Sequence, residues 1–226
     1  MMKFIGLSAK DFEDFHEGKP AWIVSSGPSI ISIDLSQIEG GVSFFINGAV
    51  RLMDQVSSEA KYFVTSDERF LSEEDNRALV STNLPSDVLR LVRDKCRPVD
   101  VYSAVSRTLY VRSLGRNGFS RNLMNGYYFG CTSTMLAVQF AYWSGCNPVI
   151  LLGTDLTYPF SNKRFYDEAK PQPADKLLNV QLWNIANAAG VFKRNARELL
   201  SCSPNSLTRP YVDYIDYSAA VAKYSR

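Results

Sequence analysis

Histidine is nearly absent from this sequence. His16 is the single histidine among 226 residues, and the four cysteines, Cys96, Cys131, Cys146 and Cys202, are widely spaced with no Cys-x-x-Cys pair. Structural zinc needs four nitrogen or sulfur ligands, usually in short-spaced pairs, so we expect no metal site. Three of the cysteines lie in apolar segments and are expected to be reduced core residues, although a disulfide stays open.

Long apolar runs are also missing. The longest apolar region, residues 135–153, is interrupted by glutamine, glycine, asparagine and proline. These interruptions divide it into a helix and a strand instead of one bilayer-spanning segment. Residues 4–7 are apolar, but charged residues follow at once, so they lack the core of a signal peptide. We therefore expect no transmembrane segment, and the reduced thiols make a cytoplasmic location the expectation.

The chain as a whole lacks a large excess of either charge: its formal net charge is +2. This balance argues against a nucleic-acid-binding protein. A P-loop is lacking too, because no Gly-Lys-Ser/Thr follows Gly115 or Gly118. Residues 87–121 are the exception in charge, with eight basic residues against three acidic ones. This excess either attracts an anionic substrate toward a cleft or forms an ordinary solvated face.

What is present begins with an apolar run that stops at small residues. Residues 21–24 suit a buried strand, and the turn after them consists of Ser25, Ser26, Gly27, Pro28 and Ser29. In an α/β sheet such a turn lies at the carboxyl edge, where the next helix points free N–H groups at anions. We interpret it as a phosphate or nucleotide site. The alternative is a plain turn with Ser29 as N-cap.

Other predicted strands end in the same way. The apolar runs 42–46, 62–64 and 148–152 are followed, respectively, by Asn47, by Thr65, Ser66 and Asp67, and by Gly153, Thr154 and Asp155. If the strands are parallel, their tips converge on one sheet edge, where open α/β folds bind ligands. Thr132 and Ser133 open an apolar helix at 135–143 and offer N-cap hydroxyls for the same site.

This pattern predicts an α/β, Rossmann-like fold with a mainly parallel sheet and helices on both faces. We expect one nucleotide-binding domain over residues 1–226, with an N-terminal helix within 1–20, a lid-like loop within 156–175 and a tail at 208–226. The tyrosine-rich tail is expected to pack on the body or on another subunit, which leaves a homo-oligomer open. His16 is expected at the surface.

Further elements follow from hydrophobic spacing and breaker residues. The spacing predicts helices at 49–56, 68–80, 87–95 and 175–189, and a late strand at 198–202. Asp155, at the end of the best apolar strand, is interpreted as a general base, as a ribose ligand or as the cap of the next loop.

Four landmarks in this order resemble the bacterial sialyltransferases of glycosyltransferase family 42 and the related MptE-like proteins, which include pterin diphosphokinases. They are S-S-G-P-S-I at 25–30, the strand end at Asn47, the run from T-S-T-M-L-A-V-Q-F-A-Y-W-S-G into V-I-L-L-G-T-D-L at 149–156, and C-S-P-N-S at 202–206. The resemblance covers residues 21–207. The ordered set is more specific than any single motif.

The resemblance implies a sheet that binds the CMP of a nucleotide sugar, without a metal or a resident cofactor, and transfers the sugar to a glycan hydroxyl. It implies that the turn at Gly27 and the side chain of Asn47 contact the nucleotide, and that Thr132 and Ser133 lie near the sugar. Tyrosines beyond the Gly-x-Asp strand hold the departing phosphate in that family, a role that the resemblance gives to Tyr158 and Tyr166.

This chain departs from the family pattern in three places. Ser25 and Ser26 stand where the family has glycine and asparagine, and Phe129 stands where it has arginine. The family's histidine base falls near Asn179, and asparagine is not a useful base at neutral pH. Either another group such as Asp155 serves, or the chemistry differs. The alternatives are an MptE-like diphosphokinase that uses Mg²⁺ near Asp67 and Asp155, and a non-catalytic nucleotide-binding module.

Overall fold

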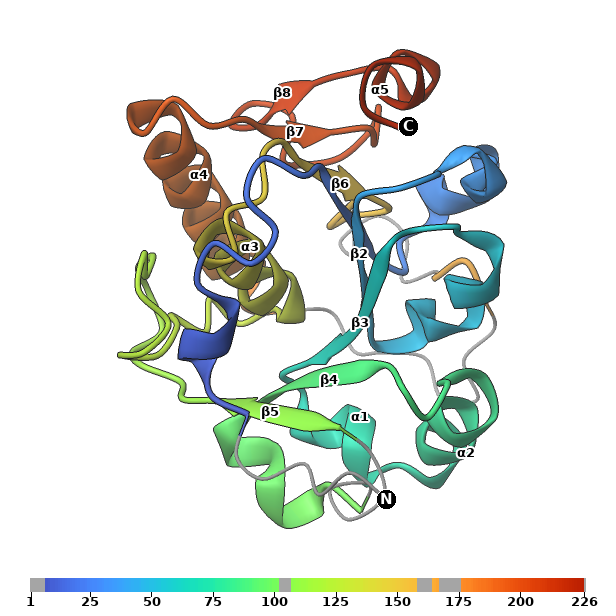
Figure 1. The fold of residues 1–226 in the computed structure, drawn as a ribbon, viewed down its shortest axis with the longest axis vertical. Coiled ribbons are helices and arrows are strands. Elements are labelled where there is room, and N and C mark those ends of the chain that lie inside the picture. Colours follow the sequence, from blue (N-terminus) through green and yellow to red (C-terminus); the bar gives the residue numbers. More distant parts are fainter. Residues whose placement is uncertain (1–6, 102–106, 158–163, 167–175, 226) are drawn as a thin grey trace.

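The computed structural model describes residues 7–101, 107–157, 164–166 and 176–225 of the chain. Its centre is one sheet of eight strands in the order β5-β4-β3-β2-β1-β6-β7-β8, and all neighbouring strands are parallel (Figure 1). The strands are β1 (Ala21–Val24), β2 (Val42–Ile46), β3 (Ala60–Thr65), β4 (Leu89–Arg93), β5 (Thr108–Val111), β6 (Val149–Leu152), β7 (Leu199–Ser201) and β8 (Asp213–Tyr214).

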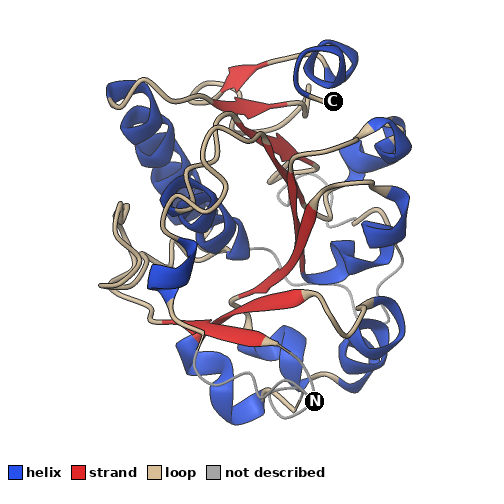
Figure 2. Cartoon of the chain, in the orientation of Figure 1, coloured by secondary structure: helices blue, strands red, loops and turns tan. Residues whose placement is uncertain are grey.

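Helices cover both faces of the sheet (Figure 2). The α-helices are α1 (Glu68–Ser72), α2 (Glu74–Asn83), α3 (Ser133–Trp143), α4 (Leu178–Arg194) and α5 (Tyr217–Tyr224). Shorter 3-10 helices are η1 (Ala9–Phe12), η2 (Pro28–Ser32), η3 (Leu35–Gln37), η4 (Asn47–Gln55) and η5 (Asp94–Val99). The α/β, Rossmann-like architecture expected from the sequence is therefore confirmed.

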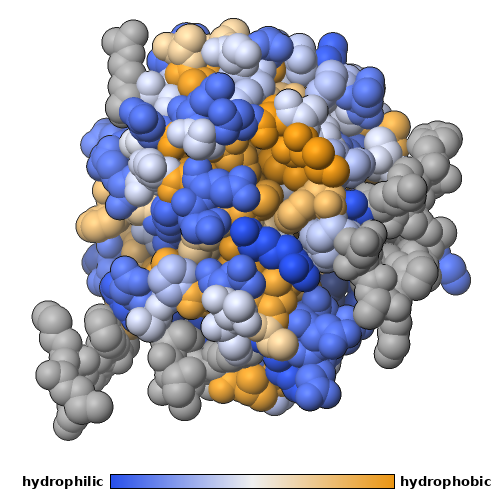
Figure 3. Space-filling model, turned by 90° about the vertical axis from the view of Figure 1, so that its right-hand side faces the viewer, coloured by the Kyte–Doolittle hydropathy of each residue, from blue (hydrophilic) through white to orange (hydrophobic). Residues whose placement is uncertain are grey.

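The core has two apolar layers, one on each side of the sheet. Helices α3 and α4 pack on one side, and η2 to η4, α1, α2 and α5 pack on the other. Strand residues alternate between the layers: Ile23 faces the first and Trp22 the second. All of β1, β2 and β6 is buried, because a parallel sheet covered on both faces needs apolar residues at every position. Figure 3 shows that the outer face to the right in Figure 1 mixes hydrophilic and apolar residues.

Three of the cysteines lie in the apolar core, Cys146 in the first layer and Cys96 and Cys202 in the second. All four cysteines are free, and Cys96, Cys146 and Cys202 are buried. Burial raises the pKa of each of these three thiols to about 12. They are therefore protonated packing residues at neutral pH.

The strand order places a topological switch point beside β1. The chain runs from β1 outward through β2, β3, β4 and β5, and then returns to β6 on the other side of β1. At such a point the connections leave in opposite directions, which opens a crevice beyond the carboxyl ends of the strands. The turn at Gly27 follows β1 directly.

The helix predicted at 87–95 is wrong, because residues 89–93 form strand β4, and the neighbouring strand β5 was not predicted. Arg90 made the segment look amphipathic, but its side chain is fully buried. Its Nη2 donates to Asp100 Oδ1 at 2.7 Å, and its Nη1 donates to Thr108 Oγ1 at 3.1 Å. A buried arginine that is paired in this way takes a position that its charge alone would assign to the surface.

Two helix predictions hold in modified form. The segment expected as one helix at 68–80 divides into α1 and α2 at Glu73, and the segment expected at 49–56 is the 3-10 helix η4. The helix at 175–189 is confirmed as α4, although the described helix begins at Leu178 and continues to Arg194. The late strand is confirmed as β7.

His16 was expected at the surface but is buried. Its Nε2 lies 2.7 Å from the hydroxyl of Tyr62 on β3, a residue far away in the sequence. Burial, followed by the nearby positive charge of Lys19, lowers the pKa of His16 from 6.5 to about 4. The same burial raises the pKa of the Tyr62 hydroxyl, so both partners of this pair are neutral near pH 7.

The His16 pair predicts acid sensitivity. Below about pH 6.5 the unfolded chain protonates His16, whereas the folded chain does so only near pH 4, so the free energy of unfolding falls as pH drops through this window. We expect this histidine to contribute about 2 to 3 kcal/mol to the fall. Urea unfolding of wild type and His16→Gln at both ends of the window measures it. Glutamine keeps a hydrogen-bond acceptor, and an unchanged pH dependence in this variant would contradict the assignment.

Candidate active site

A cleft of about 660 Å³ lies at the carboxyl edge of the sheet, above the switch point. It is bounded by the ends of β1, β2, β3, β4 and β6, by the N-terminus of α3 and by the start of α4. The predicted convergence of strand tips is therefore observed. Eleven of the predicted residues line the cleft: Ser25, Ser26, Gly27, Pro28, Asn47, Ser66, Asp67, Thr132, Ser133, Gly153 and Asp155.

The tips of β1 and β6 are held together at Gly27. The Gly27 N–H donates to the carbonyl of Gly153 at 2.8 Å, and the hydroxyls of Ser25 and Thr154 lie 3.0 Å apart. A Cβ on residue 27 would overlap the Gly153 carbonyl oxygen and come within 2.5 Å of Asp155 Oδ2. Glycine is needed here for close approach of the two chain segments, not for an unusual backbone angle, since its φ is −70°.

Asp155 is engaged by the turn after β1. The Ser29 N–H donates to Oδ2 at 2.8 Å, and the Ser29 hydroxyl donates to Oδ1 at 2.5 Å. Ser203, from the C-S-P-N-S segment, lies 2.9 Å from the same hydroxyl. Both carboxylate oxygens thus have partners, and Asp155 holds the first turn of η2. These bonds are made to the segment after β1 and not to the loop that follows Asp155, so the capping, base and ribose-ligand interpretations all stay predictions.

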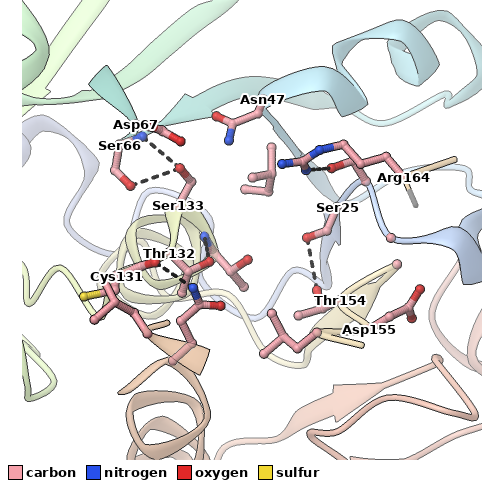
Figure 4. A pocket seen from close by; sticks show the side chains of 18 of the residues that line it. Ser25, Asn47, Ser66, Asp67, Cys131, Thr132, Ser133, Thr154, Asp155 and Arg164 are labelled. Atoms are coloured by element: carbon pink, nitrogen blue, oxygen red, sulfur yellow. Dashed lines mark hydrogen bonds between the residues drawn. The ribbon is translucent and has the colours of Figure 1, made fainter. Parts of the chain in front are cut away.

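The N-terminus of α3 opens into the cleft (Figure 4). Thr132 is its N-cap and accepts from the Thr134 N–H at 3.3 Å. Ser133 Oγ accepts from the Ser66 N–H at 2.9 Å, which ties the helix to the end of β3. Thr65, the last residue of β3, is buried under this contact and does not line the cleft. The free N–H groups and dipole of α3 make this corner favourable for an anion.

Asn47 has a buried amide oxygen that finds no partner among the described residues. It follows β2 with a φ of +50°, and Figure 4 shows its side chain directed toward the cleft. Its Oδ1 is buried and has no hydrogen-bond partner within the described part of the chain. Buried acceptors in native proteins are almost always bonded, so this oxygen is suited to receive a donor group from a ligand.

Three arginines that line the cleft, Arg69, Arg93 and Arg164, were not among the predicted site residues. Arg164 Nη1 donates to Ser26 Oγ at 2.6 Å, and the following N–H, of Phe165, donates to the Ser26 carbonyl. Arg93, the last residue of β4, lies with its guanidinium carbon 3.9 Å from the centre of the Phe129 ring. Arg93 was missed because its segment was predicted as a helix and not as a strand that ends at the cleft. Arg164 lies in a loop, where hydrophobic spacing gives no signal. With Lys176, they bring positive charge to the cleft.

Only part of the predicted lid, residues 156–175, lies within the described residues. Tyr158 and most of 156–175 lie outside the described residues, whereas Thr157 and Arg164 line the cleft. Tyr166 is not among the lining residues; its hydroxyl packs against Gly48, and its ring covers the Arg51 guanidinium at 4.8 Å. Asn179, at the family's histidine position, is exposed on the first turn of α4 and does not line the cleft either.

The described residues contain neither a cluster of metal ligands nor a helix suited to cross a membrane. Within 7–101, 107–157, 164–166 and 176–225, no three histidine, cysteine, aspartate or glutamate side chains gather as metal ligands would. None of the helices described for this chain combines the length and the apolar character that a membrane crossing requires.

No protein-family model matches the chain, and no curated protein matches it either. Solved structures do resemble it. The sialyltransferase CstII from Campylobacter jejuni, in complex with the substrate analogue CMP-3FNeuAc, superposes with a TM-score of 0.50 at 14% identity, over 87% of this chain and 86% of that one. Its complex with cytidine-5'-monophosphate gives 0.51 at 14%, over 88% and 85%. This chain has a sialyltransferase-like glycosyltransferase fold.

A second glycosyltransferase shares the fold. The MAf glycosyltransferase from Magnetospirillum magneticum AMB-1 gives a TM-score of 0.54 at 14% identity, over 92% of this chain but only 37% of its own length. At this identity the sialyltransferase-like fold is what the two proteins share with our chain. The MptE-like part of the sequence resemblance has no counterpart among these structures and stays a prediction.

Proposed function

We propose that this protein is a glycosyltransferase that binds a CMP-type nucleotide sugar in the cleft and transfers the sugar to a glycan hydroxyl. The observation that carries the proposal is Asn47: its side chain lines a cleft that also holds a helix N-terminus and cationic side chains, and its buried Oδ1 has no partner among the described residues. A nucleotide offers both complements, since its amino and hydroxyl groups donate hydrogen bonds and its phosphate is an anion. Structures with this fold contain CMP or a CMP-sugar analogue.

The cleft residues would divide the donor between them. The N-terminus of α3, with Ser133 at its first turn, and the guanidinium of Arg164 would hold the phosphate. Phe129 stands in place of the family's arginine, and the guanidinium of Arg93, at the end of β4, lies over its ring. Arg93 would therefore supply the positive charge that the family's arginine provides. These cations would also stabilise the CMP that leaves when the bond between the sugar and the phosphate breaks.

Transfer also requires a base that takes the acceptor hydroxyl's proton as its oxygen bonds to the sugar. Asp155 has both oxygens engaged by Ser29, and Asn179 is not a base. The contacts described for the cleft therefore support nucleotide binding, and we propose Asp155, Tyr158 or Tyr166 as the residues that would act in the transfer step. We propose no resident cofactor, with the nucleotide sugar acting as substrate.

Removal of the Asn47 amide is expected to weaken CMP binding about tenfold, because one hydrogen bond in a cleft is worth about 1 to 1.5 kcal/mol. Asn47→Gly is the suitable variant, because glycine tolerates the φ of +50° and the fold is kept. Titration calorimetry with CMP measures the loss. Asn125→Gly, at an exposed asparagine of a loop outside the cleft, is the matched control. If CMP, CDP, UDP and GDP all fail to bind the wild-type protein, the proposal is wrong.

A non-catalytic nucleotide-binding module is the second candidate, favoured by the asparagine at position 179. Slow hydrolysis of a CMP-sugar by the purified protein, reduced in Asp155→Asn, would exclude it. The diphosphokinase alternative needs Asp67 and Asp155 on Mg²⁺, but Asp67 Oδ2 pairs with Arg69 at 3.1 Å and Asp155 bonds to Ser29. Magnesium-dependent ATP binding would be required to revive it.

A further inference from the structure

Acidic residues are missing from two long stretches of the chain. No aspartate or glutamate occurs in residues 101–154 or in residues 176–197. The first stretch contains the loop between β5 and α3, and the second contains α4. Together they account for much of one side of the molecule, on the left in Figure 1.

The loop of the first stretch packs against α4 of the second. Asn184 of α4 accepts from the Gly118 N–H at 2.9 Å and donates to Asn117 Oδ1 at 3.1 Å. The rings of Phe119 and Phe192 meet below these bonds at 6.0 Å. The loop is therefore fixed along one side of α4.

Exposed cations gather on this surface, and the acidic residue directly beside one of them in the sequence is Asp175, which precedes Lys176. The cations include Arg116 and Arg121 from the loop, and Lys176, Lys193 and Arg194 from α4 and its approach. We call this set of five, together with the outer side of α4, the basic face. Since the whole chain carries +2, the residues outside these five sum to −3. The near-neutral net charge therefore conceals a marked asymmetry.

The basic face also presents an exposed tryptophan. Trp183 lies in the middle of α4 and is 54% exposed, whereas Trp22 and Trp143 are buried. Residues 177–192 contain no charged residue at all, although one side of α4 faces solvent. Trp183 is opposite the buried Ile185 stripe, and Arg194, three turns later, shares its side. Leu177 and Met124 are further exposed apolar side chains of the two stretches.

We infer that the basic face binds the surface of a lipid bilayer that contains anionic lipids. Arginine and lysine are attracted to the negative leaflet, and tryptophan with neighbouring apolar side chains settles at the level of the headgroups. A soluble polyanion matches the cations alone and leaves Leu177 and Met124 without a role. Attachment of this kind is peripheral and needs no membrane-spanning helix.

The basic face adjoins the cleft. Lys176 and Leu177 belong to both, because they line the cleft at the start of α4. If the proposed function holds, a bound bilayer would bring the cleft close to an acceptor held in the membrane. The membrane binding itself needs no nucleotide and is tested without one.

Trp183 is a built-in reporter for the test. Vesicles of phosphatidylcholine alone, and vesicles that also contain phosphatidylglycerol, are added to the full chain while tryptophan emission is recorded. We expect a blue shift and quenching by brominated lipid with the anionic vesicles only, and both should weaken as salt is raised. Absence of binding to the anionic vesicles, or equal binding to both kinds, would overturn the inference.

Variants locate the contact. Arg116→Gln/Arg121→Gln is expected to lower the partition coefficient about 25-fold, from about fivefold for each charge lost near an anionic surface. Trp183→Ala, followed by vesicle sedimentation, should lower it about tenfold. Lys223→Gln on α5 is the matched control and should change nothing. Binding that survives in both face variants, or an equal Trp183 blue shift with heparin or single-stranded DNA, would contradict membrane binding by this face.

Discussion

Gly27→Ala is expected to lower the free energy of unfolding by about 2 to 3 kcal/mol and to abolish measurable CMP binding. The added Cβ overlaps the Gly153 carbonyl oxygen and lies within 2.5 Å of Asp155 Oδ2. Neither atom can retreat freely, because that carbonyl accepts from the Gly27 N–H and the carboxylate is held by Ser29. The strain must therefore separate the tips of β1 and β6, which form the floor of the cleft. Gly27→Val should be worse.

Urea unfolding and calorimetry measure the two effects separately. Gly115→Ala is the control, because the nearest atom to its added Cβ is a ring carbon of Tyr128 at 3.9 Å. This variant should stay within about 0.5 kcal/mol of wild type and bind CMP normally. If Gly27→Ala is as stable as wild type, the close approach at the switch point is wrong. If it is destabilised but binds CMP unchanged, the cleft near Gly27 is not the nucleotide site.

The sequence predicted the central strands and the edge where the cleft lies. Continuous apolar runs at 21–24, 42–46 and 148–152 are buried on both sides by helices, so their hydrophobicity alone indicates their position. Each ends in small polar residues, and parallel pairing brings these ends together. Asn47 and Gly27 could therefore be selected as site candidates before any side-chain geometry was known.

Partners far apart in the sequence account for what could not be predicted. Arg90 is tolerated inside the sheet because Asp100 reaches it from η5, and His16 is tolerated inside because Tyr62 on β3 meets it. Arg164 contacts Ser26 across most of the chain length. The spacing of apolar residues along the sequence does not reveal such pairings. A charged residue is therefore predicted at the surface unless its partner is known.

Asp100→Ala is expected to lower the free energy of unfolding by about 3 to 5 kcal/mol, because it leaves the Arg90 guanidinium charged and buried without its carboxylate. Both side chains are 0% exposed, and the Tyr110 hydroxyl also donates to Asp100 at 2.8 Å. Arg69→Ala supplies the contrast: its ion pair with Asp67 is exposed, with side-chain exposures of 72% and 32%, and should cost less than about 1 kcal/mol.

A double replacement separates the ion pair from simple loss of packing. In Arg90→Met/Asp100→Leu no buried charge remains, so much of the stability lost in Asp100→Ala should return, since apolar side chains often replace a buried ion pair at little cost. If the double variant is as unstable as Asp100→Ala, the charge is not the cause. Arg93 ends the same strand and lines the cleft, so a loosened β4 in Asp100→Ala should also weaken CMP binding. Arg69 lines the cleft too, but Arg69→Ala leaves β4 intact. This variant therefore tests the effect of one cleft charge on CMP binding without a change in the strand.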